Sequence, residues 1–330
     1  MPGLEHYWYR ISPLHLILLP VSLLFRALAA LRRLLYRSRF LPSHKLPVPV
    51  IVIGNISVGG TGKTPLTLAL AQHLIQRGWH PLIVSRGYGG TAQQARPVNS
   101  DSDASQVGDE PLLMARRDLC PIWIGKDRAS AAQAALQAHP ECDVVLCDDG
   151  LQHYRLQRDS EIAVIDGMRG FGNGFMLPAG PLREPVTRLG TVDAVVVNGG
   201  EALPGQYAMH LSGEVFHNLL DPGNTVAANH FLALNNHAVA GIGNPQRYFR
   251  HLQALGIPFT PHAFPDHHPY SRADLAYAKC DAILLTEKDA VKCAPFADAR
   301  YWVLRVDARI DPDLIGHILR KIEPHGRKTA

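Results

Sequence analysis

Short apolar runs alternate with longer stretches of helical periodicity from Pro47 onward. This alternation is typical of a parallel sheet covered by helices on both faces. The pattern predicts strands at residues 49–53, 81–85, 121–124, 143–147, 161–165 and 193–197, with helices over residues 63–77 and 127–138. Residues 91–106 are small and polar, and we expect a mobile loop there.

The regular alternation weakens after residue 198. Residues 200–236 have the character of extended linker strands, and they lead to a second region with strands expected at 238–241, 282–285 and 301–305. We therefore expect an α/β protein with three parts: an N-terminal helix within residues 1–40, a larger parallel-sheet domain over 41–205 and a smaller α/β domain over 206–330. The C-terminal helix of this last part can pack back on the larger core.

The N-terminal segment is apolar over residues 14–25, but Pro20 and Arg26 interrupt it. A simple membrane-spanning helix needs roughly 18 to 20 apolar residues, so the pattern favours a basic amphipathic helix that lies on a membrane surface. One side carries Leu24, Leu28, Leu31 and Leu35, and the opposite side carries Arg26, Arg33 and Arg37. Two alternatives remain open: a secretory signal that ends near residues 27–29, and an ordinary helix that packs on the protein's own core.

The charge distribution supports a membrane-facing N-terminus. The net charge of +4 is too small to indicate nucleic acid as a partner, yet the first 45 residues hold seven Lys or Arg and one acid, Glu5. Such a basic segment suits anionic lipid headgroups. The five cysteines form no CxxC pair, which indicates reduced thiols and places the rest of the chain in the cytosol.

A phosphate-binding loop follows the first predicted strand. Gly62, Lys63 and Thr64 complete the pattern G-x-x-x-x-G-K-[ST], in which Ser57 replaces the first glycine. A serine can occupy that turn if its backbone stays in an ordinary region. Lys63 is expected to neutralise the β- and γ-phosphates, and Thr64 to ligate Mg²⁺. The expected nucleotide-binding residues are Asn55, Ile56, Ser57, Val58, Gly59, Gly60, Thr61, Gly62, Lys63 and Thr64.

Two adjacent carboxylates follow the strand at 143–147. Asp148 and Asp149 stand where a nucleotide-binding sheet places the acid that organises Mg²⁺, although an ordinary Asp-Gly turn is the alternative. Gln152, His153 and Arg86 are expected at the same edge of the sheet, where α/β folds bind ligands. Asp109 opens a predicted helix and is a candidate base for a substrate hydroxyl or, alternatively, a helix N-cap.

Eight short sequence motifs, taken in their order along the chain, resemble the tetraacyldisaccharide 4'-kinase family over nearly the whole chain after the N-terminal helix. They cover residues 54–65, 85–89, 107–111, 148–153, 177–185, 241–245, 264–268 and 285–289. The resemblance implies a P-loop kinase domain, a smaller domain, an active-site cleft between them and an N-terminal helix toward the membrane.

The resemblance also implies an activity. It implies transfer of the γ-phosphate of ATP, with Mg²⁺, to the 4'-hydroxyl of a tetraacyldisaccharide 1-phosphate, which gives lipid IVA in lipid A synthesis. The implied partners are this lipid substrate and the cytoplasmic leaflet of the bacterial inner membrane, with neither nucleic acid nor an obligate protein partner.

Residue roles follow from the same resemblance. Asp109 is expected to act as the base, with His267 as its partner and His268 as the alternative partner. Lys63 and Asp149 complete the expected catalytic set. Thr64, Asp148, Asp149 and Glu184 are expected around Mg²⁺, while Arg128 and Arg183 are candidates for binding phosphate, or for ordinary surface ion pairs.

A membrane-associated switch ATPase without kinase activity is the alternative function. Proteins of that class carry a lysine just before the paired glycines of the loop, where this chain has Val58. The segment 241–245 superficially resembles a dinucleotide-binding fingerprint, but Gln246 occupies the position of its last glycine, so we interpret it as a structural turn.

Overall fold

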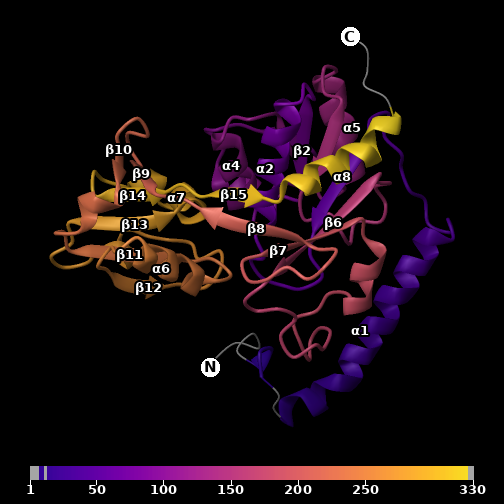
Figure 1. The fold of residues 1–330 in the computed structure, drawn as a ribbon, viewed down its shortest axis with the longest axis horizontal. Helices are drawn as coiled ribbons and strands as arrows, with labels where there is room; N and C mark the ends of the chain where they lie inside the picture. The colour runs from indigo at the N-terminus through magenta and orange to yellow at the C-terminus, as the bar shows by residue number, and fades with distance from the viewer. Residues whose placement is uncertain (1–6, 11–12, 326–330) are drawn as a thin grey trace.

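Two β-sheets organise the computed structural model, which describes residues 7–10 and 13–325 (Figure 1). The larger sheet has nine strands in the order β15-β8-β7-β6-β1-β5-β2-β4-β3. The smaller sheet has six strands in the order β10-β9-β14-β13-β11-β12. The two sheets lie side by side, and β8 and β15 run between them in Figure 1.

The larger sheet is parallel from β8 through β4, and an antiparallel strand closes each edge. Its strands are β1 (Val50–Gly54), β2 (Pro81–Ser85), β3 (Arg96–Val98), β4 (Ile122–Ile124), β5 (Val144–Cys147), β6 (Ser160–Asp166), β7 (Ala194–Asn198), β8 (Tyr207–Ser212) and β15 (Asp307–Ile310). Its helices are α2 (Lys63–Ile75), α3 (Ala104–Val107), α4 (Asp109–Arg116), α5 (Arg128–Ala138) and α8 (Pro312–Ile322).

The smaller sheet is parallel through β14, β13, β11 and β12, and it is antiparallel at β9 and β10. Its strands are β9 (Val215–Asn218), β10 (Thr225–Ala227), β11 (Asn236–Ala240), β12 (Thr260–Ala263), β13 (Ala282–Thr286) and β14 (Tyr301–Leu304). Its helices are α6 (Pro245–Ala254) and α7 (Glu287–Cys293).

The chain leaves the larger sheet along β8 and returns along β15, and these two strands pair with each other. After the return, α8 buries Leu314, Ile315 and Ile318 in the same core cluster as Leu66 and Leu70 of α2. The end of the chain therefore stabilises the first sheet, as expected for the C-terminal helix.

The predicted strands and crossover helices are confirmed to within about two residues at their ends, the usual uncertainty for element boundaries. The expectation of a mobile loop over residues 91–106 is wrong. β3 and the first three residues of α3 lie within that segment, and β3 pairs antiparallel with β4. Two of the three β3 residues are exposed and only Val98 is buried, so its sequence lacks the apolar run that identifies a buried strand.

The division that we predicted at residues 205 and 206 falls just before β8. Because β8 and β15 both belong to the larger sheet, the strands of the second part are shared between the two sheets. The N-terminal part predicted over residues 1–40 includes residues 1–6, 11 and 12, which lie outside the described residues.

The N-terminal helix α1 (Pro13–Arg37) continues without a break through Pro20. It is long and apolar enough to cross a membrane by length and composition. In Figure 1 it lies along the outside of the larger sheet, away from the smaller one. Ser22 is buried and donates a hydrogen bond to the Met176 carbonyl, and Phe25 and Ala29 pack against the core.

The two predicted faces of α1 take different positions in the structure. The leucine face points away from the protein, with Leu24 60% and Leu28 56% exposed. The arginine face borders the body of the protein, where Arg33 is half-buried and donates to Thr191, while Arg26 and Arg37 remain exposed. It lines a groove of about 310 Å³ formed by Arg26, Ala29, Ala30, Arg33, Leu34, Arg37, Tyr154, Glu184 and Pro185. One stripe of α1 thus packs on the core, and the exposed leucines are compatible with membrane anchoring.

Replacing Leu24 and Leu28 together by glutamate is expected to lower binding to anionic phospholipid vesicles by more than about tenfold, because each buried leucine contributes roughly 1.5–3 kcal/mol. Vesicle co-sedimentation measures the effect. The control is the double variant Leu203→Glu/Leu232→Glu, which alters two exposed leucines outside α1. Equal binding by both double variants would contradict a membrane role for this face.

Candidate active site

The phosphate-binding loop connects β1, which is buried throughout, to α2. Gly62 has φ 99° at the N-cap of α2, and a Cβ there would lie 2.2 Å from the Asn198 side-chain nitrogen. Glycine is therefore required both for backbone conformation and for space. Asn198 at the end of β7 donates to the Thr61 carbonyl, and Asn55, directly after β1, donates to the Thr61 hydroxyl; both contacts hold the loop in shape.

The serine that replaces the first glycine of the motif is tolerated without strain. Ser57 is absent from the described non-glycine residues with positive φ, and it forms an antiparallel bridge with Leu182. The next backbone amide, of Val58, donates to the Pro181 carbonyl at 2.9 Å. The segment around residue 182 thus supports the loop and brings Arg183 to the site.

The two carboxylates after β5 have opposite electrostatic environments. Burial raises the pKa of Asp148 to about 7, and the charges of Glu110 and Asp149 act in the same direction. Burial also acts to raise the pKa of Asp149, but the charges of Lys63, Arg183 and Arg128 lower it overall. Lys63 Nζ lies 3.5 Å from Asp149 Oδ1. Asp149 is thus ionised at neutral pH and ready to contact a cation.

The donor set around Asp148 fits Mg²⁺. Asp148 is fully buried and accepts a hydrogen bond from Thr67, while its Oδ2 atom has no hydrogen-bond partner. A buried unpartnered carboxylate oxygen is costly unless a cation or a proton satisfies it. Thr64 is the second residue of α2, the helix that also holds Thr67. Among residues 7–10 and 13–325, the protein presents no group of three His, Cys, Asp or Glu side chains that alone would hold a metal.

Asp109 and His267 meet across the gap between the two sheets. Asp109 is the first residue of α4, and His267 follows β12 of the smaller sheet, 158 residues later. His267 Nδ1 lies 3.0 Å from Asp109 Oδ2. The alternative partner, His268, instead lies 3.6 Å from Asp274.

The charges around this pair favour an ionised carboxylate. Burial acts to raise the pKa of Asp109, but the His267 hydrogen bond and the charges of Lys288 and Lys292 lower it overall. The hydrogen bond with Asp109 raises the pKa of His267, against burial and the charge of Lys288. The Tyr88 ring lies 5.1 Å from the His267 ring and covers it on one side.

The predicted arginines differ in their surroundings. Arg128 is buried and donates to the Asp149 carbonyl at 2.7 Å, and Arg183 lies 3.3 Å from Asp149 Oδ1. Both cations therefore contact Asp149, Arg128 at its backbone carbonyl and Arg183 at its carboxylate. Arg86 directly follows β2, which pairs in parallel with β5, so it lies at the same edge of the sheet as Asp148 and Asp149, and its side chain is exposed.

Glu184 has protein partners that the other predicted metal ligands do not share. Its carboxylate accepts a hydrogen bond from Tyr154 at 2.5 Å and pairs with Arg188 at 3.0 Å. Tyr154 and Glu184 line the groove beneath α1, and Arg188 neutralises the charge of the Glu184 carboxylate. The structure thus gives Glu184 a structural ion pair where we expected a contact to Mg²⁺.

Gln152 and His153 lie beside the loop but contact protein groups. Gln152 donates to the Asn55 carbonyl at 2.9 Å. His153 Nε2 lies 3.3 Å from Asp127, and burial together with the charge of Arg128 lowers the pKa of His153 to about 4. His153 is consequently neutral at neutral pH.

Comparison with known proteins decides the family. A family model described as tetraacyldisaccharide-1-P 4'-kinase matches residues 14–323. The chain belongs to this family. The tetraacyldisaccharide 4'-kinase of Methylobacillus flagellatus is 51% identical over 319 residues, covering 97% of this chain and 95% of the relative. The enzyme of the same name from Pseudomonas aeruginosa is 47% identical over 324 residues, covering 96% of each chain.

A solved structure shares the fold. LpxK from Aquifex aeolicus in complex with ATP superposes with a TM-score of 0.79 at 29% identity, covering 94% of this chain and 99% of that chain. The P-loop type of parallel sheet expected from the sequence is thus confirmed.

In this member of the 4'-kinase family, contacts between the sheets involve residues to which sequence reasoning assigned no role. Arg247 of α6 pairs with Asp166 at 2.7 Å, and Arg169 donates to the Gly243 carbonyl. A Cβ at Gly243 would lie 2.4 Å from the Gly60 nitrogen, so the turn at residues 241–245 approaches the phosphate-binding loop directly. Neither the segment 54–65 nor the segment 241–245 contains a sequence pattern that predicts this contact.

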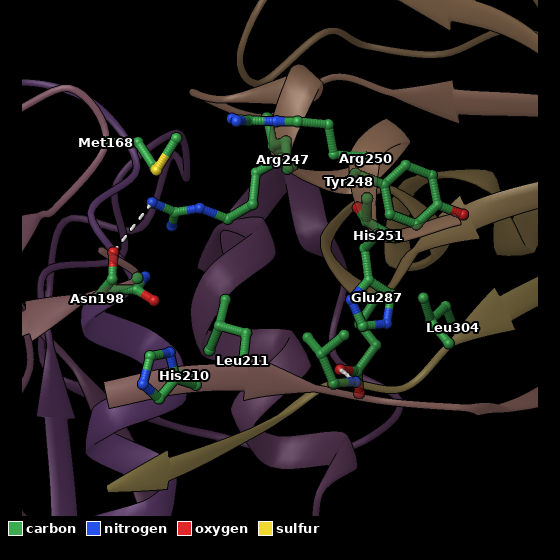
Figure 2. A pocket seen from close by; sticks show the side chains of 14 residues that line it. Met168, Asn198, His210, Leu211, Arg247, Tyr248, Arg250, His251, Glu287 and Leu304 are labelled. Carbon is green, nitrogen blue, oxygen red and sulfur yellow. Dashed lines mark hydrogen bonds between the residues drawn. The ribbon is translucent and has the colours of Figure 1, made fainter. Parts of the chain in front are cut away.

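A cavity of about 370 Å³ opens beside the phosphate-binding loop of the 4'-kinase, between the two sheets (Figure 2). Figure 2 shows Arg247 reaching across it toward the Asn198 carbonyl, with Leu211 and His210 of β8 below. The lining comprises Met168, Asn198, Gly199, His210, Leu211, Ile242, Arg247, Tyr248, Arg250, His251, Thr286, Glu287, Leu304 and Val306.

Proposed function

We propose that this chain transfers the γ-phosphate of ATP to the 4'-hydroxyl of a tetraacyldisaccharide 1-phosphate, with Asp109 accepting the proton of that hydroxyl. As a tetraacyldisaccharide 4'-kinase it is an ATP-dependent transferase of lipid A synthesis that uses Mg²⁺. The observation that carries the residue assignment is the pairing of Asp109 with His267 from the other sheet at 3.0 Å.

The chemistry of the step follows from the residues that converge there. Asp109 takes the hydroxyl proton as the hydroxyl oxygen forms a bond to the γ-phosphorus, and the bond from that phosphorus to the ADP oxygen breaks. His267 orients the Asp109 carboxylate through the hydrogen bond between its Nδ1 atom and Asp109 Oδ2. Lys63 neutralises negative charge on the phosphates as it shifts toward ADP. Arg183 and Arg128 hold Asp149 in place beside Lys63.

Thr64, Asp148 and Asp149 would hold Mg²⁺ with the nucleotide. When bound, the ion supplies positive charge that neutralises the phosphates. The unpartnered oxygen of Asp148 and the ionised carboxylate of Asp149 are oxygen donors of the kind that this ion prefers.

The cellular position is proposed from α1 and from the thiols. The exposed leucine face of α1 suits the acyl region of a membrane, and the acceptor is itself a lipid. All five cysteines are free, which suits a reducing compartment. We place the enzyme on the cytoplasmic face of the bacterial inner membrane, acting as a kinase domain and a smaller domain around one cleft, with neither nucleic acid nor an obligate protein partner.

The cavity in Figure 2 is proposed to hold the adenosine of ATP. The γ-phosphate must face Asp149 and Asp109, on the β5 and β2 side of the loop. The nucleoside then extends to the opposite side, beyond the ends of β6 and β7, where Met168 and Asn198 line the cavity. Ligands of parallel sheets bind beyond these strand ends.

Filling this cavity with Leu211→Trp is expected to raise the Kd for ATP by more than about tenfold and to leave the Kd for inorganic triphosphate unchanged, because only the nucleoside competes with the indole. Isothermal titration with each ligand distinguishes the two effects. Equal weakening of both would show that the variant perturbs the phosphate-binding loop instead.

The proposed function is tested with γ-³²P-labelled ATP, Mg²⁺ and detergent-dispersed tetraacyldisaccharide 1-phosphate. Label is expected in the lipid, and an acceptor that lacks the 4'-hydroxyl should remain unlabelled. Release of labelled inorganic phosphate without labelled lipid, at a rate independent of the acceptor, would overturn the proposal and support the switch ATPase. Val58, in place of that class's lysine, already argues against the alternative.

A further inference from the structure

Lys288 lies beside the Asp109–His267 pair although neither the phosphate-binding loop nor the paired acids includes it. It is the second residue of α7. It belongs to the sequence motif Thr286-Glu-Lys-Asp289, to which the proposed function assigns no role. Its side chain is only 14% exposed. A buried ammonium group requires compensating partners, so its contacts indicate what it stabilises.

The ammonium group of Lys288 lies within hydrogen-bonding distance of three side chains from two separate segments, and 4.0 Å from Asp109 Oδ2. Nζ lies 3.0 Å from Glu110 Oε1 on α4, 3.1 Å from Asp266 Oδ1 and 3.3 Å from His267 Nε2. Glu110 belongs to the larger sheet's helices, whereas Asp266 and His267 follow β12 of the smaller sheet. Lys288 therefore ties the two halves of the cleft together at the point where Asp109 and His267 meet.

The contact with His267 determines where the imidazole carries its proton. An ammonium group has three N–H donors and no acceptor. His267 Nε2 must therefore present its lone pair to Lys288, which leaves the proton on Nδ1. Nδ1 then donates to Asp109, 3.0 Å away. The hydrogen bond made by one ring nitrogen thus selects the protonation of the other.

We propose that Lys288 is a positioning residue that holds His267 as the neutral, Nδ1-protonated imidazole and thereby keeps the Asp109 carboxylate oriented and ionised. This inference rests on the proposed role of Asp109 as the base. Lys288 acts through His267 and Asp109 and need not touch either substrate.

The charges near the pair agree with this role. Lys288 lowers the pKa of both Asp109 and His267. The other charged or titratable groups that face the pair are Lys292 and Asp289 of α7, Glu110 of α4, Asp266 and Tyr88. Lys292 is held by Asp289 at 3.1 Å and lies 3.8 Å from Asp109, where Lys288 also lies 4.0 Å from the same carboxylate oxygen, but of these two lysines Lys288 is the one that contacts the imidazole.

Removing the ammonium group has a defined effect on the pH profile. Without Lys288 the pKa values of Asp109 and His267 both rise. Activity requires ionised Asp109, which exists above its pKa and is lost as the pH falls through that pKa. The acidic limb of the profile should consequently move to higher pH.

The test compares Lys288→Met, Lys288→Arg and the control Lys321→Met, whose lysine pairs with Asp193 on the far side of the protein. Lipid phosphorylation is measured from about pH 5 to pH 9, and we expect kcat of Lys288→Met to fall by roughly tenfold to a hundredfold, with its acidic limb shifted upward and ATP affinity retained. Lys288→Arg should restore most of kcat and the position of the limb.

Two outcomes would overturn the inference: a Lys288→Met enzyme with the wild-type kcat and limb, or a fall in kcat that leaves the limb in place and that arginine does not rescue. If Asp109→Asn remains active, the assignment of the base itself fails. If Asp109→Asn is inactive and Lys288→Met behaves as wild type, only the role of Lys288 fails.

A spectroscopic measurement on the wild-type protein needs no folded Lys288 variant. In ¹⁵N-histidine-labelled protein, the His267 resonances are those lost in His267→Gln. A protonated Nδ1 and an unprotonated Nε2 at neutral pH are expected. A proton on Nε2 would contradict the inference directly.

Discussion

Asp109→Asn is expected to lower kcat for lipid phosphorylation by about a thousandfold, within the range that general base catalysis supplies, while the Kd for ATP stays within about a factor of two of wild type. The amide has nearly the shape of the carboxylate but cannot accept the hydroxyl proton. Asp109 is 5% exposed, so water has little access to replace it as the base. The split between kcat and ATP binding distinguishes this residue from the nucleotide site.

Single-turnover phosphate transfer and ATP titration measure the two quantities on the same preparations. Asp101→Asn is the matched control, because Asp101 is exposed in the segment just before α3 and α4. In the variant, Lys292, whose Nζ lies 3.8 Å from Asp109 Oδ2, loses a negatively charged partner. Thermal unfolding checks that the variant nevertheless stays folded. Loss of ATP binding in Asp109→Asn would instead assign Asp109 to the nucleotide site.

Lys63→Met is expected to lower kcat/KM by at least about a hundredfold and also to weaken ATP binding, since a preorganised charge on the transferring phosphate supplies roughly 3–4 kcal/mol in comparable sites. Lys63 is 11% exposed and lies at the start of α2, where the phosphate-binding loop ends. Methionine keeps most of the length of the side chain and removes only the charge.

Kinetics at several ATP concentrations separate the effect on binding from the effect on transfer. The expected pattern is a raised Kd for ATP together with a lowered kcat, whereas Asp109→Asn lowers kcat alone. Lys321→Met serves again as the control for loss of a lysine. A Lys63→Met enzyme with wild-type kcat would mean that another cation, such as Arg128 or Arg183, carries the phosphate charge.

The sequence predicted some of the metal-binding candidates better than others, because the contacts that each carboxylate makes depend on the folded structure. Asp148 and Asp149 could be located from the sequence because a short apolar strand leads directly into them. Glu184 has the residue type of a magnesium ligand, but Arg188 and Tyr154 satisfy its charge. Residue type alone does not reveal such competition, because the partners are set by packing beneath α1.

Local sequence determined the elements of this protein and the phosphate-binding loop, because apolar periodicity and the glycines of the loop act over a few residues. The likeness to a known family added Asp109 and His267 as a pair. Only the tertiary structure placed Lys288 against His267, set the arginine face of α1 along the border of the protein body and brought Gly243 against Gly60. Each of these contacts joins segments that are far apart in the chain, and the packing of the two sheets and of α1 decides which of them form.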